Sequence, residues 1–544
     1  MKKIILILSL ILLFGFFLRS CTEQRLGDES AVAEEYSLEA EAMTIRHSIG
    51  TEVKNLNPAF PLTFDEGNLF FNVYETLVKL DSNGNITQGS ASSWEVSQDN
   101  LVYTFHLRNT MWSDGSKLTS RDFFNGFKYI LEKETESPFA YKLFPILNAQ
   151  AFHDELVDET ELGINIVDDN TLEIILERPR EDILSLLTLP YFTPLKSEQR
   201  FQLRIENELY PNATNGRYFI DKESKEGFII LKKNPYHYDY ENEHDIVIEL
   251  ITIENSSNRI SAFQTGVVDI ASNILPKEAN YLMAEEGRYE FTGYGNFYYI
   301  FNSSKYPFND MSLRDIAVRS TQVELISEGV NGDGNLTSLD MLSSRMNQNI
   351  YSKIESQILD RQIINQGQNI NQGQNIDLGL LFRESGFIDR ISILSFEEEK
   401  DIKTAIALKS VLEKNLGIGV DLNISSMRDI PKEELINYDI IQYPGFENIG
   451  SILDVMEFWI WNYPEISLGI SEALEVEIIQ RNISPNEEDY LELLVEIGNE
   501  INEGNVFLPV YNKSTTNLIK PYIQGLDISK HGFLLYDNIM VEKK

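Results

Sequence analysis

Three residues of the types that hydrolases use stand in one corner of the chain. His106, Ser113 and Asp114 could supply a general base, a nucleophile and an orienting acid. The same residues also favour a simpler interpretation, because short polar side chains followed by Gly115 are typical of a turn. We therefore expect a turn and a solvated strand edge here, and no catalytic site.

The elements that would position this corner can be predicted from its sequence. Residues 104–108 alternate apolar and polar side chains, as a half-buried strand does. Thr119 and Asp122 have the spacing of a capping box and predict that a helix begins there. The helix should bury one apolar face, made of Phe123, Phe127, Ile130 and Leu131. The corner is thus expected to be architectural.

A second group of chemically capable residues lies in "HYDYENEH" (237–244). This stretch contains His237, Asp239, Glu241, Glu243 and His244, which are types that bind metal ions. It follows an Asn-Pro pair, which favours a solvated loop. The chain has six His and one Cys, and it contains no nucleophile elbow or zinc motif. We expect neither an enzyme nor a cofactor or metal.

Length and charge narrow the class of protein further. With 544 residues the chain should fold into two or three domains, and its 42% hydrophobic residues can supply their cores. The 46 basic and 85 acidic residues give a net charge of −39. Such a charge repels phosphate, so a nucleic-acid partner is not expected.

The N-terminus has the pattern of a targeting segment. Lys2 and Lys3 precede an apolar run over residues 4–18, which has the length of a signal-peptide core. The run ends in "LRSC", which resembles a bacterial lipobox although Arg19 departs from it, and Cys21 is the only cysteine. We predict lipidation of Cys21, with an incidental thiol behind an uncleaved anchor as the alternative. Residues 22–43 are rich in Glu and Ala and predict a tether.

The rest of the chain alternates strand and helix patterns, which indicates α/β domains. Strands are predicted at 170–176, 246–253 and 419–424, and a helix at 404–416. The repeated hexapeptide of "NQGQNINQGQNI" (365–376) offers little to bury, so we expect a surface loop there.

Nine stretches, taken in order, resemble the extracytoplasmic oligopeptide-binding proteins of peptide ABC importers, which are family 5 bacterial solute-binding proteins. They are "GTEVKNLNP" (50–58), "YETL" (74–77), "ASSWEVSQDNLVYTFHLRNTMWSDG" (91–115), "NGRYFI" (215–220), "LKKNPYHYD" (231–239), "FQTGVVDI" (263–270), "YPFNDMSLRDIAVR" (306–319), "KNLGIGVDL" (414–422) and "LPVYNKSTTNLIKPYIQG" (508–525). The resemblance runs from about Met43 to the C-terminus.

The resemblance implies an α/β, two-lobed periplasmic-binding-protein fold of class II type, with an extra small domain in the first lobe. The implied segments are a signal peptide (1–20), a tether (21–43), a first part of lobe I (44–74), an accessory domain (75–214), a second part of lobe I (215–296), lobe II (297–509) and a return to lobe I (510–544).

The resemblance also implies a function. The chain would be a lipid-anchored monomer in the cell envelope, on the periplasmic or extracellular face of a bacterial membrane. It would capture oligopeptides by closing its lobes and deliver them to ABC permease subunits that work with a cytoplasmic ATPase. The alternatives are a surface lipoprotein of the same fold that acts as a sensor or adhesin, and a binder of a non-peptide ligand such as nickel or haem.

Ligand-binding residues can be carried over by position. The resemblance implies Leu62, Thr63 and Phe64 in the first lobe, Phe139 and Tyr141 in the accessory domain, and Phe297, Tyr298, Tyr299, Gln442, Tyr443, Gly445, Phe446, Glu447 and Tyr511. For the aromatic residues, plain core packing is the alternative. Oligopeptide-binding members carry acids where this chain has Leu62 and Ile300, so the ligand class stays open.

Glu447 has a particular implied role. Peptide-binding members place an aspartate in the second lobe, where it pairs with the ammonium group of the peptide. The matching stretch, residues 438–456, has no Asp between Tyr443 and Ile452, and Glu447 is the only acid between these two residues. We predict that Glu447 supplies this charge, with a solvated loop carboxylate as the alternative.

Overall fold

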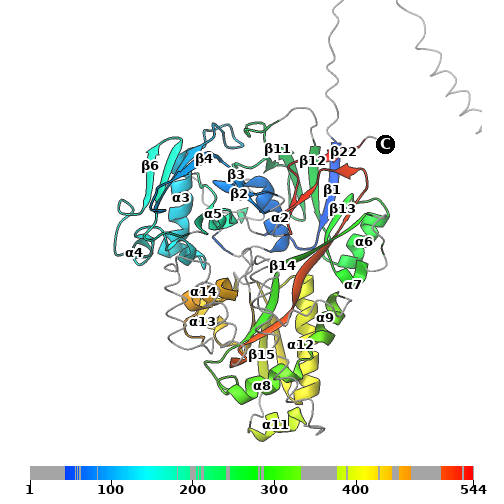
Figure 1. Ribbon diagram of the computed structural model, residues 1–544. Helices are drawn as coiled ribbons and strands as arrows, with labels where there is room; N and C mark the ends of the chain where they lie inside the picture. Colours follow the sequence, from blue (N-terminus) through cyan, green and yellow to red (C-terminus); the bar gives the residue numbers. More distant parts are fainter. Residues whose placement is uncertain are drawn as a thin grey trace, which may run out of the picture. The chain divides into compact units, whose positions relative to one another are not determined.

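The computed structural model describes most of the chain from residue 43 onward (Figure 1). The described residues are 43–54, 57, 59–60, 63–81, 84–180, 182–196, 204–205, 208–209, 213–240, 246–279, 282, 287–331, 377–386, 390–426, 429–443, 452–466, 504–529 and 532–542. The predicted signal peptide, the tether to residue 42 and the repeat at 365–376 lie outside them.

Ten strands form the main sheet, in the order β10-β11-β12-β1-β13-β18-β14-β17-β15-β16. Their bounds are β1 Met43–Ile49, β10 Tyr218–Ile220, β11 Phe228–Lys233, β12 Ile246–Thr252, β13 Ile270–Ile274, β14 Arg288–Phe301, β15 Arg390–Ser395, β16 Gly419–Ile424, β17 Ile440–Gln442 and β18 Phe507–Ile519.

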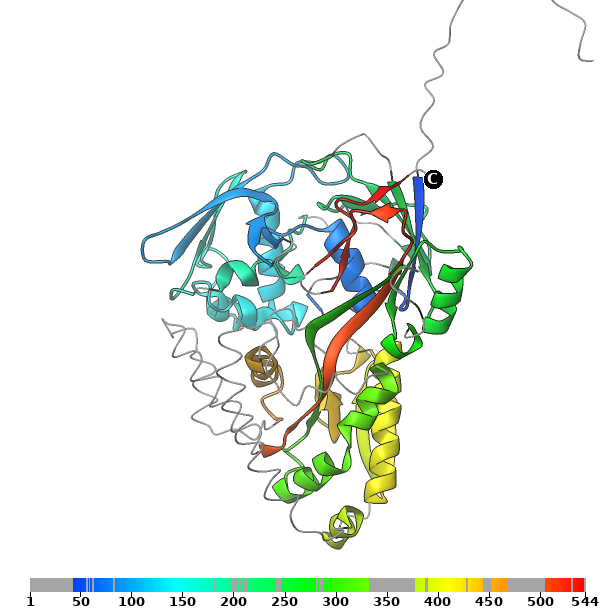
Figure 2. The same ribbon diagram turned by 45° about the vertical axis from the view of Figure 1, so that its right-hand side comes forward.

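Two parallel regions of this sheet are joined by one long antiparallel pair. At one end β1 lies parallel to both β12 and β13, and at the other β15 lies parallel to both β16 and β17. The pair of β14 and β18 connects them, because β18 also pairs with β13 and β14 also pairs with β17 (Figures 1 and 2). We call the part with β1 the first lobe and the part with β15 the second lobe.

The pair that joins the lobes is irregular in its middle. The register of β14 against β18 shifts between Thr292 and Asn296 and again between Phe297 and Tyr298. Such shifts bend a strand locally and increase its twist. The ladder is therefore least regular where the chain passes from one lobe to the other.

Helices cover the strands of both lobes (Figure 1). Their bounds are α2 Phe64–Val73, α3 Ser120–Leu131, α4 Ala149–His153, α5 Ile183–Leu186, α6 Ser256–Gln264, α7 Pro276–Ala279, α8 Met311–Ser320, α9 Val323–Asn331, α11 Leu378–Glu384, α12 Glu399–Leu416, α13 Lys432–Leu435 and α14 Ile452–Asn462, with short 3-10 turns at Lys133–Thr135, Ala140–Leu143 and Pro190–Phe192. In the second lobe, Leu408 and Leu412 of α12 share a core with Ile393 of β15 and Val420 of β16.

A separate four-stranded sheet, in the order β4-β5-β7-β6, belongs to the region predicted as an accessory domain. Its strands are β4 Ala91–Val96, β5 Val102–Leu107, β6 Ile164–Asp168 and β7 Thr171–Ile175. The expected corner is confirmed here, since β5 leads through a turn with Gly115 at φ +81° into α3. The Asp122 carboxylate accepts hydrogen bonds from the amide and the hydroxyl of Thr119, at 2.8 and 3.0 Å. The four apolar residues predicted for the helix face are all buried.

The C-terminal segment returns to the first lobe and binds α2. The amides of Leu534 and Tyr536 donate to the side chains of Asn68 and Asn72, at 2.9 and 2.8 Å. Asn72 Nδ2 in turn donates to the carbonyl of Leu534 at 2.8 Å. Short strand pairs complete the described structure, namely β2 Val78–Leu80 with β3 Ile86–Gln88, β8 Arg204–Ile205 with β9 Glu208–Leu209, β19 Ile523–Gln524 with β22 Met540–Val541, and β20 Asp527–Ile528 with β21 Leu534–Leu535.

The other predicted elements can be compared with the structure. The strands expected at 170–176, 246–253 and 419–424 are β7, β12 and β16. The predicted helix at 404–416 is present but begins earlier, at Glu399. Within the described residues, no helix combines the length and the apolar character that crossing a membrane requires.

Candidate ligand-binding site

Thr63 and Phe64 lie at the N-terminus of α2. Thr63 is its N-cap, and its amide donates to Glu66 Oε2 at 2.9 Å while Glu66 N donates to Thr63 Oγ1 at 3.2 Å. The buried Asp65 carboxylate accepts from the amides of Gly50 and Thr51, at 2.9 and 2.8 Å. Burial raises the pKa of Asp65, against the lowering effect of Arg259 and these amides. The first turn of α2 therefore holds the loop after β1 in place.

Four of the predicted aromatic residues belong to the crossing strands β14 and β18. Phe297, Tyr298, Tyr299 and Tyr511 are all at most 2% exposed. The ring of Phe297 stacks on Tyr511 with centroids 4.8 Å apart, and Tyr299 Oη lies 3.4 Å from Ser395 Oγ. Burial raises the pKa of the Tyr299 hydroxyl far above its usual value. These side chains are part of the interior at the junction of the lobes.

Gln442 is the last residue of β17 and Tyr443 follows it, beside the same junction. Gln442 Oε1 accepts from the amide of Phe396 at 3.1 Å and from the hydroxyl of Ser395. The amide of Tyr443 donates to the carbonyl of Tyr298 at 3.1 Å, which continues the pairing of β17 with β14. Leu62, Gly445, Phe446 and Glu447 lie outside the described residues, as does Cys21.

Phe139 and Tyr141 lie at a different place, in the accessory region. Phe139 stacks on Tyr191 with ring centroids 3.8 Å apart. Their segment contacts α14 of the second-lobe sequence, because Asn462 Nδ2 donates to the carbonyl of Pro138 at 2.9 Å. The rings of Phe144 and Trp461 meet edge to face at 5.1 Å. The predicted residues therefore form two groups, one at the lobe junction and one at α14.

The segment from Ser395 to Glu398 connects the predicted residues at the junction, and sequence analysis did not select it. Ser395 contacts Tyr299 and Gln442, while Glu398 Oε1 accepts from the amide of Phe64 at 2.8 Å. The segment follows the carboxyl end of the parallel strand β15, which is where open α/β sheets bind ligands. A strand pattern followed by "SFEEEK" and a helix pattern was the signal that could have found it.

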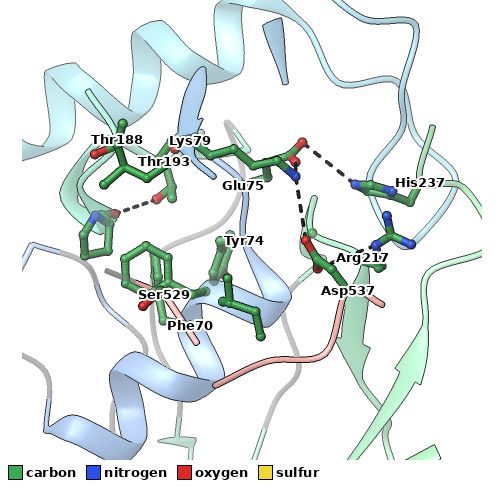
Figure 3. A pocket seen from close by; sticks show the side chains of 16 residues that line it. Phe70, Tyr74, Glu75, Lys79, Thr188, Thr193, Arg217, His237, Ser529 and Asp537 are labelled. Carbon is green, nitrogen blue, oxygen red and sulfur yellow. Dashed lines mark hydrogen bonds and ion pairs between the residues drawn. The ribbon is translucent and has the colours of Figure 1, made fainter. Parts of the chain in front are cut away.

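A small cavity of about 70 Å³ lies elsewhere, inside the first lobe (Figure 3). Glu75 is its central acid and accepts from Lys79 Nζ at 3.2 Å and from Tyr238 Oη at 2.9 Å. His237 Nε2 lies 3.8 Å from Glu75 Oε2. Burial alone would raise the pKa of Glu75, but the charge of Lys79 and the bonds from His237 and Tyr238 lower it to about 2.

The groups around this cavity pair with one another. Asp537 lies 3.8 Å from Lys79 Nζ and 3.6 Å from Arg217 Nε, and Arg217 also meets Asp239. We call Glu75, Lys79, Arg217, His237 and Asp537 the charged cluster. Three of the stretches that carry the family resemblance meet here, namely 74–77, 215–220 and 231–239. Their charged residues hold the first lobe together.

The expectation of a solvated loop is wrong for His237, which is only 6% exposed. Its partner is Glu75, and Asp239 is bound by Arg217. Glu241, Glu243 and His244 lie outside the described residues. Among the residues that the structure does describe, no group of three or more His, Cys, Asp or Glu side chains could hold a metal ion.

The hydrolase-type residues of the opening corner each have another partner. His106 lies 3.8 Å from Glu95. Ser113 Oγ accepts from the amide of Thr214 at 3.0 Å, and Asp114 is bound by Ser116 and Lys196. The structure places these side chains in turn and surface contacts, as expected.

Part of the chain matches a known protein family, and the chain has relatives of known name. Residues 85–319 match the family described as bacterial extracellular solute-binding proteins, family 5, middle segment. The oligopeptide-binding protein OppA of Bacillus subtilis is 24% identical over 78% of this chain and 78% of its own length. The periplasmic oligopeptide-binding protein OppA of Salmonella typhimurium is 24% identical over 89% of this chain and 90% of its own length.

Solved structures share the fold. Haemophilus influenzae OppA, in complex with RPPGFSPFR, matches with a TM-score of 0.74 at 21% identity, covering 92% of this chain and 99% of that one. The murein tripeptide binding protein MppA of Escherichia coli matches with a TM-score of 0.76 at 22% identity, over 93% and 99% of the two chains. Its unliganded open form reaches 0.58 at the same identity, over 93% and 98%.

The two-lobed α/β fold with an additional small sheet is shared with these solved structures. Residues 85–319 match the bacterial extracellular solute-binding proteins of family 5, which confirms the resemblance that the sequence indicated. Members of this family bind solutes and are not enzymes, which agrees with the expectation from the sequence.

Proposed function

We propose that the chain captures oligopeptides between its two lobes and delivers them to the permease of an ABC importer. The observation that carries the proposal is the fold itself, shared over nine tenths of the chain with proteins named for peptide binding. The proposed site is the junction beside β14 and β18, where Thr63, Phe64, Tyr299 and Gln442 are joined by residues 395–398.

The physical requirements of the task fit this site. A binder that tolerates many sequences must pair with the peptide backbone, which strand addition does, and must hold the charged ends by ionic contacts. Lobe closure then follows from a ligand that binds the closed arrangement better than the open one. We propose the irregular middle of β14 and β18 as the hinge, and segments 44–74, 215–296 and 510–544 as lobe I with 297–509 as lobe II.

The most informative experiment is mass spectrometry of ligand that copurifies with the full chain, followed by binding of the identified peptides. We expect a mixture of short peptides, recovered intact after incubation and bound by one copy of the chain. Recovery of a metal ion, haem or another non-peptide ligand, or cleavage of added peptides, would contradict the proposal.

We further propose that Cys21 carries a lipid that anchors the chain at the cell envelope. The motivation is the charged start, the apolar run and the position of the only cysteine. Cys21→Ala should abolish acyl labelling and release the protein into the soluble fraction. Unchanged membrane retention of the variant would instead favour an uncleaved apolar anchor.

A further inference from the structure

Three consecutive glutamates at the start of α12, in the second lobe, each meet a different group of the first lobe. Both carboxylate oxygens of Glu397 lie near Lys54 Nζ, at 3.3 and 3.2 Å. Glu398 Oε1 accepts from the amide of Phe64 at 2.8 Å, and Glu399 Oε2 accepts from the amide of Ser256 at 2.9 Å. We call Glu397, Glu398 and Glu399 the acidic triplet.

Two of these contacts are made at helix N-termini. Phe64 is the first residue of α2 and Ser256 the first residue of α6, which have 10 and 9 residues. The first amides of a helix have no acceptor within the helix, and the helix dipole favours negative charge at that end. The second lobe thus supplies anionic acceptors to two helices of the first lobe.

A buried cation strengthens the contact at Glu399. Arg259 is 1% exposed, and its guanidinium is fixed by the carbonyls of Ile253 and Asn273, at 2.7 and 2.8 Å. Arg259 Nη2 lies 3.5 Å from Glu399 Oε2. Lys403, one turn further along α12, bridges to Glu278 of the first lobe at 2.7 Å. At this contact, Arg259 of the first lobe pairs with Glu399 of the second lobe, and Lys403 of the second lobe pairs with Glu278 of the first lobe.

We propose that the acidic triplet is a latch that stabilises the closed arrangement of the lobes in the absence of ligand. These contacts join groups of different lobes, so opening the lobes must break them, and Glu397 and Glu399 make theirs with Lys54 and Ser256, which are not among the residues proposed to bind peptide. A closed population that exists before binding raises the apparent affinity for any ligand that requires closure. The open form of MppA also matches this chain less well than the other MppA structure, with TM-scores of 0.58 and 0.76.

The latch acts on the site proposed for peptides and rests on that proposed function. Glu398 bonds to Phe64, which belongs to the segment predicted to lie along the ligand. The position of this segment therefore depends on whether the lobes are closed. In the latched state, a peptide would meet the segment at Phe64 already in its bound position. In the open state, this segment would be displaced from the second lobe.

The test measures lobe separation directly. Spin labels at Val267→Cys in the first lobe and Leu380→Cys in α11, both exposed positions, report the distance between lobes in a full-length Cys21→Ser chain. In Glu398→Ala/Glu399→Ala, the ratio of short to long distances without peptide should fall about tenfold. Glu433→Ala/Glu434→Ala removes two exposed acids of the same lobe and should leave the ratio unchanged.

A more conservative double variant shows whether an effect of the alanine variant comes from misfolding. Glu398→Gln/Glu399→Gln keeps the shape and an acceptor oxygen but removes the charge, so its shift should be smaller and in the same direction. Distance distributions that match the unmodified chain in both variants would overturn the latch. If the variants open but no peptide binds any of the chains, the latch stands and the proposed peptide function fails.

Discussion

The charged cluster of the first lobe and the acidic triplet both use glutamate carboxylates that accept hydrogen bonds and ion pairs. The cluster makes these contacts within one lobe, whereas the triplet makes them between the lobes. Glu75 has a side chain that is 9% exposed, and its donors all belong to the first lobe. Glu397 and Glu399 are 29% and 21% exposed, and their acceptors reach donors of the other lobe. A carboxylate whose donors all lie in its own lobe keeps them when the lobes move, whereas a carboxylate that binds donors of the other lobe loses those contacts when the lobes open.

The largest expected effect is a loss of folding stability when the central acid of the charged cluster is removed. Glu75→Ala leaves Lys79 and His237 without their shared acid, so the free energy of unfolding should fall by about 3–5 kcal/mol. Urea denaturation measures it. Glu95→Ala is the control, because its side chain is 81% exposed and lies 3.8 Å from the partly exposed His106, and it should change the free energy of unfolding little. A loss as small as that of the control would show that the cluster is not structural.

Acid should weaken the charged cluster in a defined range of pH. The pKa of Glu75 is lowered from 4.5 to about 2, so the folded state keeps this carboxylate ionised where the unfolded state protonates it. Its contribution is complete above pH 4.5 and is lost as the pH falls through 2, which amounts to about 3 kcal/mol. Glu75→Gln should therefore give a flatter dependence of unfolding free energy on pH. Parallel curves would contradict this assignment.

Peptide affinity should depend on Glu447, which belongs to neither the charged cluster nor the acidic triplet. Glu447→Gln should weaken binding of a peptide with a free amino terminus by about 2 kcal/mol, since an ammonium group would lose its partner. Calorimetric titration measures the change, and an N-acetylated peptide serves as the control that should be unaffected. Equal affinities of the two proteins for the free-amine peptide would refute the anchor.

The smallest effect concerns the outermost member of the triplet. Lys54 is 47% exposed, so its ion pair with Glu397 should contribute less than about 0.5 kcal/mol to the free energy of unfolding. A double-mutant cycle with Lys54→Met and Glu397→Gln at low and high salt measures the coupling. A larger coupling that persists in salt would contradict this expectation.

Local elements could be predicted from the sequence because local signals define them. The corner from β5 to α3 has an alternating strand, a turn glycine and a capping acid, and all three appear as expected. The start of α12 was missed because its first turn is made of charged residues that carry no apolar periodicity.

The contacts within the candidate site could not be predicted from the sequence. Thr63 and Phe64 follow from the family resemblance, but their contact with Glu398 joins residues more than 300 positions apart. His237 could be taken for a loop residue because its partner, Glu75, also lies far away in the sequence. Long-range pairs of polar residues leave no periodic pattern in a sequence, so only the fold brings them together.

The attachment of the C-terminal segment to α2 has a consequence for the order of folding. Asn68 and Asn72 bind Leu534 and Tyr536, which follow them by 466 and 464 positions in the chain. The contacts of α2 in the first lobe therefore stay incomplete until the segment that contains Leu534 and Tyr536 has been synthesised. Contacts of such long sequence separation also slow folding. A chain shortened before Leu534 should consequently remain a target for proteases.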